Sequence, residues 1–280
     1  MDSLFLIGNG YVASYIADMY KGSYKTIGVC RTIKQNCDEN INIDIGNKNE
    51  KKLRSLLQPD SNIIYLAPPQ QSLHQDIIIR NFIKEINTSY IKKFVYISTS
   101  GVYGDRNDGV VNEGDSIDPR TERAKRRADA ENQIIKSKIN YVILRVPGIY
   151  GKDRLPLKRI REKLPLIKES VCRHTNLIHV KDLANIIVNC ISDLRVNNII
   201  MNVSDGNPIK TTTYYKYIYD QLGLEYPAFI DMTEAKKIYD SKRMSFVNES
   251  RILDVSLMNE LFPNIIRFRD LKDGIRDCLD

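Results

Sequence analysis

The sequence predicts an α/β fold, a doubly wound parallel sheet covered by helices on both faces. Short apolar runs typical of buried strands alternate with stretches of helical spacing over the first half of the chain. The first run ends in a turn, Gly8-Asn9-Gly10, and a helical pattern follows directly. Parallel strands buried on both faces consist of nearly continuous apolar residues, and their crossovers are almost always right-handed. These features together favour the doubly wound topology.

The expected elements follow one another in the order strand, helix, strand, helix. Strands are expected where apolar runs are bounded by Gly, Pro or polar residues, at 4–7, 24–30, 62–67, 93–98 and 140–146, with a short edge piece at 42–45. Helices are expected where apolar residues recur every three or four positions, at 11–20, 50–57, 72–86 and 119–138.

The pattern loosens after residue 150. Residues 183–194 keep helical spacing behind Asp182, a suitable N-cap, and 199–203 has the pattern of a further strand. The stretch after Gly206 mixes helices and loops. We therefore expect residues 1–150 to form the core, and residues 151–280 to complete the sheet and add a small C-terminal lobe.

Composition excludes several classes of protein. With 42% hydrophobic and 28% charged residues the chain is an ordinary globular protein. The net charge of +7 suits a phosphate-bearing ligand, or merely reflects Lys-rich codon usage, and the basic residues lack the aromatic interleaving of a nucleic-acid binder. Five scattered cysteines form no CxxC pair, and neither a disulfide framework nor a metal site is expected. Without a signal-like or membrane-length apolar run, we expect a cytoplasmic protein with no membrane partner.

The turn after the first strand carries the clearest functional signal. In Gly8-Asn9-Gly10-Tyr11-Val12-Ala13, Gly8 permits a tight turn and Gly10 lets the backbone approach a pyrophosphate. Ala13 stands where the dinucleotide fingerprint has Gly or Ala for close helix packing. The N–H groups that open the following helix favour phosphates. The core is therefore predicted to be a Rossmann-type dinucleotide-binding domain.

The end of the second strand indicates which dinucleotide binds. An NAD site usually has Asp or Glu there, whereas this strand ends in Arg31-Thr32, with Lys34 following. A guanidinium can grip a 2′-phosphate by paired hydrogen bonds, so we predict NADP(H), with NAD(H) as the alternative. Arg31 could also be a solvated charge at a strand end. Asp44 is positioned either to accept from the adenine amino group or to cap its own loop.

Three further segments carry a family resemblance. Residues 96–105 (YISTSGVYGD), 144–151 (LRVPGIYG) and 176–184 (NLIHVKDLA) resemble, in order, segments of the extended short-chain dehydrogenase/reductases, which include nucleotide-sugar epimerases and dehydratases. The resemblance implies that Thr99 matches the catalytic Ser/Thr that hydrogen-bonds a substrate carbonyl or alcohol. The alternative for Thr99 is a hydroxyl that caps its own backbone. The resemblance also implies cofactor contacts at the ends of later strands, by Ala67, Pro68, Ser98, Pro147 and Gly148.

The chain departs from that family at its proton carrier. The family uses a Tyr with a Lys four residues later, and this sequence has Arg123 and Arg127 at those positions. A guanidinium stays protonated and cannot replace the phenol. The two arginines, which we expect to share a helix face with Arg120, either hold an anionic group of substrate or cofactor, or form a solvated face paired with Asp129 and Glu131. The RxxxR form, with YLAPP at 65–69 and PGIYG at 147–151, resembles the atypical YeeZ-like branch.

If the protein is a catalyst, another group must carry the proton. Tyr103 and Tyr150 are candidates because both follow strands at the carboxyl edge of the sheet, although each could simply be a packing aromatic. His179 is interpreted as a structural histidine at a helix start.

Two functions remain. The first is an NADP(H)-dependent oxidoreductase or epimerase/dehydratase-like enzyme acting on a small or nucleotide-linked metabolite. The second is a non-catalytic NADP(H)-binding sensor or scaffold protein. Either way the expected partner is a small molecule rather than nucleic acid, and a homodimer is left open.

Overall fold

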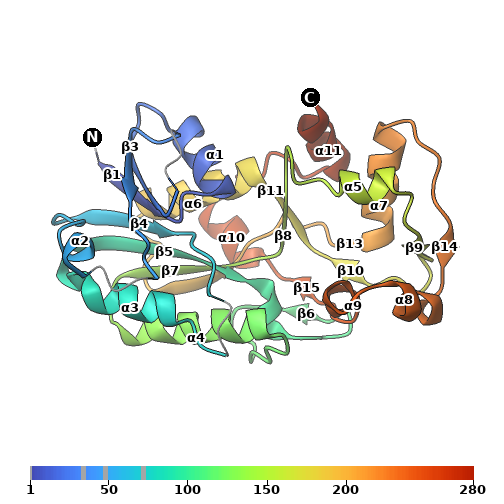
Figure 1. Cartoon of the computed structure of the whole chain (residues 1–280), viewed down its shortest axis with the longest axis horizontal. Helices are drawn as coiled ribbons and strands as arrows, with labels where there is room; N and C mark the ends of the chain where they lie inside the picture. Colours follow the sequence, from blue (N-terminus) through green and yellow to red (C-terminus); the bar gives the residue numbers. More distant parts are fainter. Residues whose placement is uncertain (1, 33–35, 47–49, 71–73) are drawn as a thin grey trace.

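A seven-stranded parallel sheet forms the centre of the protein. The computed structural model describes residues 2–32, 36–46, 50–70 and 74–280. The strand order is β12-β7-β5-β4-β1-β2-β3, and every neighbouring pair is parallel (Figure 1). The predicted α/β class is confirmed, and the order reverses beside β1, which places a switch point between β1 and β4. The strands are β1 (Ser3–Ile7), β2 (Lys25–Cys30), β3 (Glu39–Asn42), β4 (Ser61–Tyr65), β5 (Ile91–Thr99), β7 (Tyr141–Val146) and β12 (Ile199–Asn202).

Helices cover both faces of this sheet, as a doubly wound fold requires. Successive residues of β1 point to opposite faces, so that Leu4 and Leu6 join one apolar cluster while Phe5 and Ile7 join the other. The first face is covered by α1 (Tyr11–Met19), α6 (Val180–Ser192) and α10 (Ser256–Leu261), and the second by α2 (Glu50–Arg54), α3 (Ile77–Glu85) and α4 (Glu122–Lys136) (Figure 1). No helix within the described ranges is long and apolar enough to cross a membrane.

Element boundaries differ from the sequence prediction where side-chain caps decide them. Helix α3 begins at Ile77 rather than near residue 72, because the Asp76 carboxylate accepts from the backbone of Ile79. Helix α4 begins at Glu122, because Thr121 caps it. Arg120 therefore lies before the helix and does not share a face with Arg123 and Arg127, which corrects that expectation. The third strand lies at 39–42, earlier than the predicted 42–45.

The second half of the chain adds a lobe beside the carboxyl edge of the sheet. Its own core is built from buried residues such as Ile160, Ile218 and Ile275. The lobe contains α5 (Leu157–Arg161), α7 (Thr211–Gln221), α8 (Met232–Ile238), α9 (Ser241–Val247) and α11 (Leu271–Leu279) (Figure 1). Two short strand pairs link the two halves of the chain: β6 (Val110–Val111) with β15 (Ile252–Leu253), and β8 (Gly148–Tyr150) with β11 (Leu177–His179). Two more pairs lie within the second half: β9 (Leu166–Ile167) with β14 (Phe229–Ile230), and β10 (His174–Thr175) with β13 (Ile209–Lys210).

A buried ion pair fixes α4 to the sheet. Arg145 Nη2, on β7, donates to Glu131 Oε2, on α4, at 2.8 Å, and the two side chains are 5% and 3% exposed. The Ser98 hydroxyl at the end of β5 donates to the other oxygen of the same carboxylate. The Arg145 guanidinium also lies over the Tyr103 ring, 4.7 Å from its centre. These contacts hold α4 against the carboxyl ends of β5 and β7.

We expect Glu131→Leu to lower the free energy of unfolding by about 3–5 kcal/mol, because it leaves the Arg145 charge buried without its partner. Adding Arg145→Met in the same chain should recover a substantial part of that loss, because the uncompensated charge is removed. Urea unfolding of the single and double variants measures both. Equal destabilisation in the two would show that the ion pair does not carry the effect.

Candidate cofactor and substrate site

The glycine turn brings three strand ends together. Gly8 has a φ of +94°, and its N–H donates to Val29 O on β2 at 2.9 Å. A Cβ at Gly8 would lie 2.6 Å from Ala67 N, so the backbone after β1 passes directly against the backbone after β4. Gly10 is the N-cap residue of α1, and it has no side chain to accept from the N–H groups of the first helical turn. The first N–H groups of α1 are therefore available to an anion at this edge of the sheet.

The side chains within the turn bind other parts of the protein. Asn9 is buried, and its Nδ2 donates to Asn36 Oδ1 at 2.7 Å and to Asn40 Oδ1 at 3.1 Å. The Tyr11 hydroxyl donates to Lys152 O at 2.7 Å, and Val12 packs against the core. Asn9 and Tyr11 thus anchor the turn through their side chains, to the segment after β2 and to the loop after β8.

The residues expected to select the cofactor lie beyond β2. Arg31 and Thr32 follow that strand directly and are exposed. Lys34 lies outside the described residues. Asp44 Oδ1 accepts from Gly46 N at 3.0 Å, which is the loop-capping arrangement that the sequence left open. Of the residues after β4, Ala67 is buried against Gly8, and Pro68 is exposed beside it.

A cavity of about 590 Å³ opens at the carboxyl ends of β5 and β7, between the sheet and the C-terminal lobe. Ligands of open α/β sheets bind at this edge. Ser98, Thr99, Pro147 and Gly148 line it, as do Arg123 and Arg127 of α4. The other lining residues are Ile97, Ser100, Gly101, Thr121, Val146, Ile149, Arg154, His174, Thr175, Asn176, Ser245, Glu249, Ser250 and Arg251.

Thr99 reaches the cavity, but its hydroxyl oxygen already accepts a hydrogen bond. The Thr99 Oγ1 accepts from Gly101 N at 3.2 Å, where it caps the short helix η2 (Ser100–Tyr103). A hydroxyl has two lone pairs and one proton, so Thr99 can still donate to a ligand. The geometry is thus compatible with both the capping and the substrate-binding interpretations.

The two candidate tyrosines do not reach the cavity. Tyr103 is fully buried, and its hydroxyl donates to Asn202 Oδ1 at 2.8 Å. Tyr150 is buried in the core of the C-terminal lobe, and burial raises its pKa far above the usual value for a phenol. The strands before them end at the expected edge, but the rings turn inward, which favours the packing alternative over proton transfer for both.

His179 is likewise enclosed. It is fully buried, its Nδ1 accepts from Lys181 N at 3.3 Å at the start of α6, and its Nε2 lies 3.5 Å from Asp277 Oδ2. Burial lowers its pKa to about 4, although Asp277 acts in the opposite direction. The ring is therefore neutral near pH 7, as a structural histidine requires.

Arg127 and Arg123 lie one helical turn apart on the cavity wall. Arg127 Nη1 donates to the Tyr96 hydroxyl at 3.0 Å and to Ile97 O at 2.9 Å. Burial opposes its charge, but Tyr96 and Asp76 outweigh that effect and raise the pKa of Arg127. Burial lowers the pKa of Arg123, which Glu249 partly offsets.

The expected pairing of these arginines with Asp129 and Glu131 is wrong. Asp129 accepts from Asp76 N and from Gln133, while Glu131 is committed to Arg145 and Ser98. Because α4 packs closely against the sheet, its acidic residues point to partners other than the two arginines.

Sequence reasoning missed the wall that the second half of the chain supplies. Arg154 stacks on Tyr11, 4.4 Å from its ring centre, and so links the glycine turn to the cavity. Glu249 and Arg251 lie just before β15, and β15 pairs with β6. Asn176 Nδ2 donates to Arg251 O at 2.8 Å. No local motif marks these positions, since long-range pairing alone brings them to the cavity.

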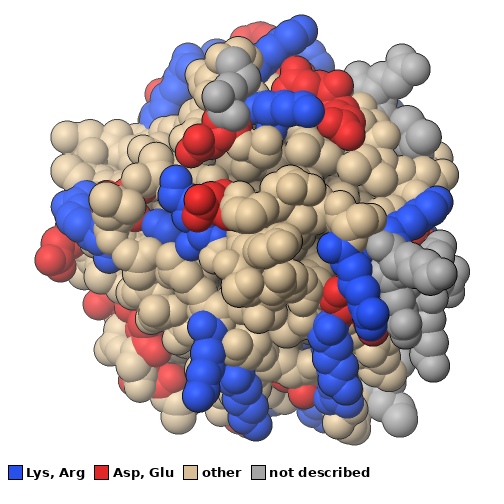
Figure 2. Space-filling view, turned by 90° about the vertical axis from the view of Figure 1, so that its left-hand side faces the viewer, with Lys and Arg blue, Asp and Glu red and all other residues tan. Residues whose placement is uncertain are grey.

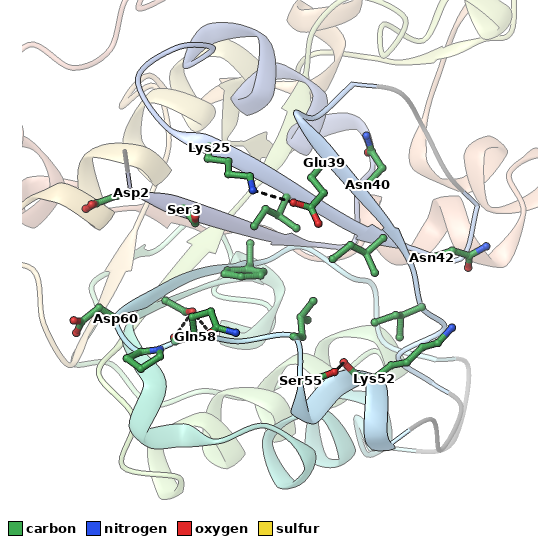
Figure 3. Close-up of a pocket in the computed structure, with 17 residues that line it drawn as sticks. Asp2, Ser3, Lys25, Glu39, Asn40, Asn42, Lys52, Ser55, Gln58 and Asp60 are labelled. Atoms are coloured by element: carbon green, nitrogen blue, oxygen red, sulfur yellow. Dashed lines mark hydrogen bonds and ion pairs between the residues drawn. The ribbon is translucent and has the colours of Figure 1, made fainter.

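A larger cavity lies at the opposite edge of the sheet. It measures about 810 Å³ and is lined where β1, β2, β3 and β4 begin. Figure 3 shows the Lys25–Glu39 ion pair on one side, and Lys52 of α2 with Ser55, which follows that helix, on the other; the ion pair measures 3.0 Å. Because ligands of this fold bind at the carboxyl edge, we place the functional site in the smaller cavity.

The end of the molecule that carries α2 and β3 has mixed charge. In Figure 2 the Lys and Arg side chains are separated from one another by Asp, Glu and uncharged surface. Among the described residues visible on this face, no continuous basic stripe of the kind that follows a nucleic-acid backbone is present.

The fold and the glycine turn define a dinucleotide-binding protein of the Rossmann type. Residues 24–194, more than half of the chain, match a family described as NAD(P)H-binding, and the protein belongs to that family. The sequence matches none of the curated proteins with which it was compared.

Several solved structures share the whole fold. A functionally unknown conserved protein from Silicibacter pomeroyi superposes with a TM-score of 0.81 at 20% identity, over 100% of this chain and 98% of that one. MoeE5 in complex with UDP-glucose and NAD gives 0.79 at 17% identity, over 100% and 97%. The UDP-glucuronic acid 4-epimerase of Bacillus cereus, in complex with UDP-glucuronic acid and NAD, gives 0.77 at 17% identity, over 99% and 97%. At this identity the likeness concerns the fold.

The close approach at Gly8 gives a stability prediction with an internal control. Gly22 also has a positive φ, +82°, but nothing lies within 4 Å of the position of its missing Cβ. Gly22→Ala should cost about 1–2 kcal/mol for the left-handed backbone alone. Gly8→Ala should cost clearly more, because its methyl group meets the Ala67 backbone. Urea unfolding compares the two, and equal losses would mean that the contact with Ala67 is unimportant.

Proposed function

We propose that this protein is an NADP(H)-binding, atypical short-chain dehydrogenase/reductase, an oxidoreductase or epimerase/dehydratase-like enzyme that acts on a small or nucleotide-linked metabolite. The proposal rests on one observation. The glycine turn of this NAD(P)H-binding family member and a polar cavity lie at the same edge of the sheet. In this proposal residues 1–150 bind the dinucleotide and residues 151–280 supply the substrate lobe. The RxxxR pair on α4 supports the YeeZ-like branch.

The charge beyond β2 supports NADP(H) over NAD(H). Arg31 is exposed directly after that strand, where the ribose of a dinucleotide bound at the glycine turn is held in this fold. A guanidinium there would form paired hydrogen bonds with the charged 2′-phosphate of NADP(H). The uncharged 2′-hydroxyl of NAD(H) would add little to binding at the same position. Backbone N–H groups of the turn and of α1 would hold the pyrophosphate.

The chemistry of the cavity sets limits on the reaction. A bound nicotinamide supplies hydride transfer, while the protein supplies position and electrostatics. Thr99 would donate its proton in a hydrogen bond to a substrate oxygen. No tyrosine or lysine occurs among the described residues of the wall, and His174 and Glu249 are the imidazole and the carboxyl group found there. His174 Nδ1 lies 3.3 Å from Asp108 Oδ2, which would orient its ring.

The alternative is a non-catalytic NADP(H)-binding sensor or scaffold protein. Three observations favour it: arginines stand at the positions of the family's Tyr and Lys, Tyr103 is enclosed, and the Thr99 hydroxyl already caps Gly101. The two functions share the same cofactor site and differ in whether the bound cofactor is consumed.

Titration with NADPH and NADH, followed by nicotinamide fluorescence, tests the cofactor. We expect tighter binding of NADPH, weakened about 10- to 100-fold by Arg31→Ala, because hydrogen bonds to charged groups contribute about 1.5–3 kcal/mol. Binding of NADH should stay unchanged. The matched control is Arg276→Ala, which removes an exposed guanidinium of α11 that pairs with Asp273. Tighter binding of NADH than of NADPH by the unmodified protein would overturn the role of Arg31.

Replacement of Thr99 separates the two functions. If the protein is a catalyst, Thr99→Val should slow NADPH oxidation with candidate carbonyl substrates at least about tenfold, while NADPH affinity is kept. Thr88→Val, at an exposed threonine before β5, is the control. Unchanged oxidation by Thr99→Val would refute the substrate-orienting role, and tight NADPH binding without turnover of any carbonyl would favour the sensor.

A further inference from the structure

Two arginines flank a single carboxylate on the outer wall of the 590 Å³ cavity. Arg251 Nη2 donates to Glu249 Oε2 at 2.9 Å, just before β15. Arg123 comes from the first turn of α4, and its charge interacts with both Glu249 and Arg251. Asp105 also acts on Arg251, but it forms its own ion pair with Arg173 at 3.0 Å. One remaining carboxylate cannot neutralise two guanidinium groups, so this part of the wall keeps a net positive charge.

Arg251 also has an unused hydrogen-bond donor. Its side chain is only 10% exposed, and its Nε is buried without an acceptor in the described structure. A buried charged N–H without a partner is unfavourable, and Glu249 engages the guanidinium only through Nη2. Oxygens of a bound anion would supply the acceptor that is missing.

The other two arginines of the cavity add to its positive charge. Arg127 donates to two neutral acceptors, the Tyr96 hydroxyl and Ile97 O, and Asp76, which also acts on its charge, does not line the cavity. Arg154 lies on the side of the glycine turn. With four arginines and one carboxylate among the described lining residues, the cavity attracts anions.

We propose that the ligand of this cavity is an organic anion, and that Arg123 and Arg251 bind its carboxylate or phosphate group in the same cavity as Thr99. Guanidinium groups match both anions through paired hydrogen bonds. Arg123, Arg251 and Thr99 line the same cavity, so one ligand can contact all three. The positions that hold the proton carrier in the resembling family thus serve recognition here. This inference rests on the proposed function, because it takes the cavity to be the substrate site.

Calorimetric titration of the full chain saturated with NADPH tests the proposal. The probes are malonate, inorganic phosphate and, as the neutral match to malonate, malonamide, all at one ionic strength. We expect malonate or phosphate to bind and malonamide not to bind, and the tighter of the two anions identifies the group preferred. Arg123→Gln and Arg251→Gln should each weaken anion binding at least about tenfold, whereas Arg276→Gln on α11 should leave it unchanged.

Glu249→Gln gives a prediction of opposite sign. It removes the negative charge that competes with the ligand, while its amide oxygen can still accept from Arg251. Anion binding should therefore tighten by about threefold or more. A purely structural role of the cluster would not produce tightening. Arg123→Gln keeps the Arg251–Glu249 pair intact, so it tests the site even if Arg251→Gln perturbs folding.

The proposal fails if neither anion binds, if malonamide binds as well as malonate, or if Arg123→Gln binds the anion like the unmodified protein. Failure of the proposed cofactor function looks different. If NADPH does not bind while malonate or phosphate still binds in an arginine-dependent way, the anion site stands and the dinucleotide role does not.

Discussion

The buried pair of Glu131 and Arg145 is the interaction on which the candidate site most depends. It ties α4 to β7, and through the Ser98 hydroxyl it reaches the end of β5 as well. Burial of two charges is tolerated only when they satisfy each other closely, so the pair leaves little freedom in how α4 sits on the sheet. Arg123 and Arg127 are placed at the cavity mouth as a consequence. The same contact explains why Glu131 does not neutralise those arginines, and hence why the cavity stays positive.

The core of the fold could be predicted because its elements are local in sequence. Apart from the polar edge strand β3, the strands of the sheet contain apolar runs such as Leu4–Ile7, and the glycine turn follows the first one at the spacing that the dinucleotide fingerprint demands. Errors occurred where a single side chain decides a boundary. Asp76 and Thr121 cap α3 and α4 later than periodicity suggested, and the Thr121 cap excluded Arg120 from the helix.

Only part of the candidate site could be predicted, because the sequence indicates where a residue lies along a strand and not where its side chain points. Residues that follow strands, such as Thr99 and Gly148, lie at the carboxyl edge by the rule of parallel sheets, and the sequence alone could place them. The direction of a side chain is a different question. Tyr103 follows β5 as expected, yet its ring turns under the sheet end to meet Asn202 and Arg145. Glu249 and Arg251 reach the cavity through the pairing of β15 with β6, which no local pattern reveals.

Arg123 and Arg127 limit what the cavity can do. A phenol beside an ammonium can give and take a proton near neutral pH, whereas a guanidinium holds its proton throughout and contributes only charge and fixed hydrogen-bond donors. Arg127 is further committed to Tyr96 and Ile97 O. In the proposed function, therefore, neither arginine carries a proton to the substrate, and both serve recognition of the ligand. The proposed chemistry then depends on groups that the C-terminal lobe contributes to the cavity, among them His174 and Glu249.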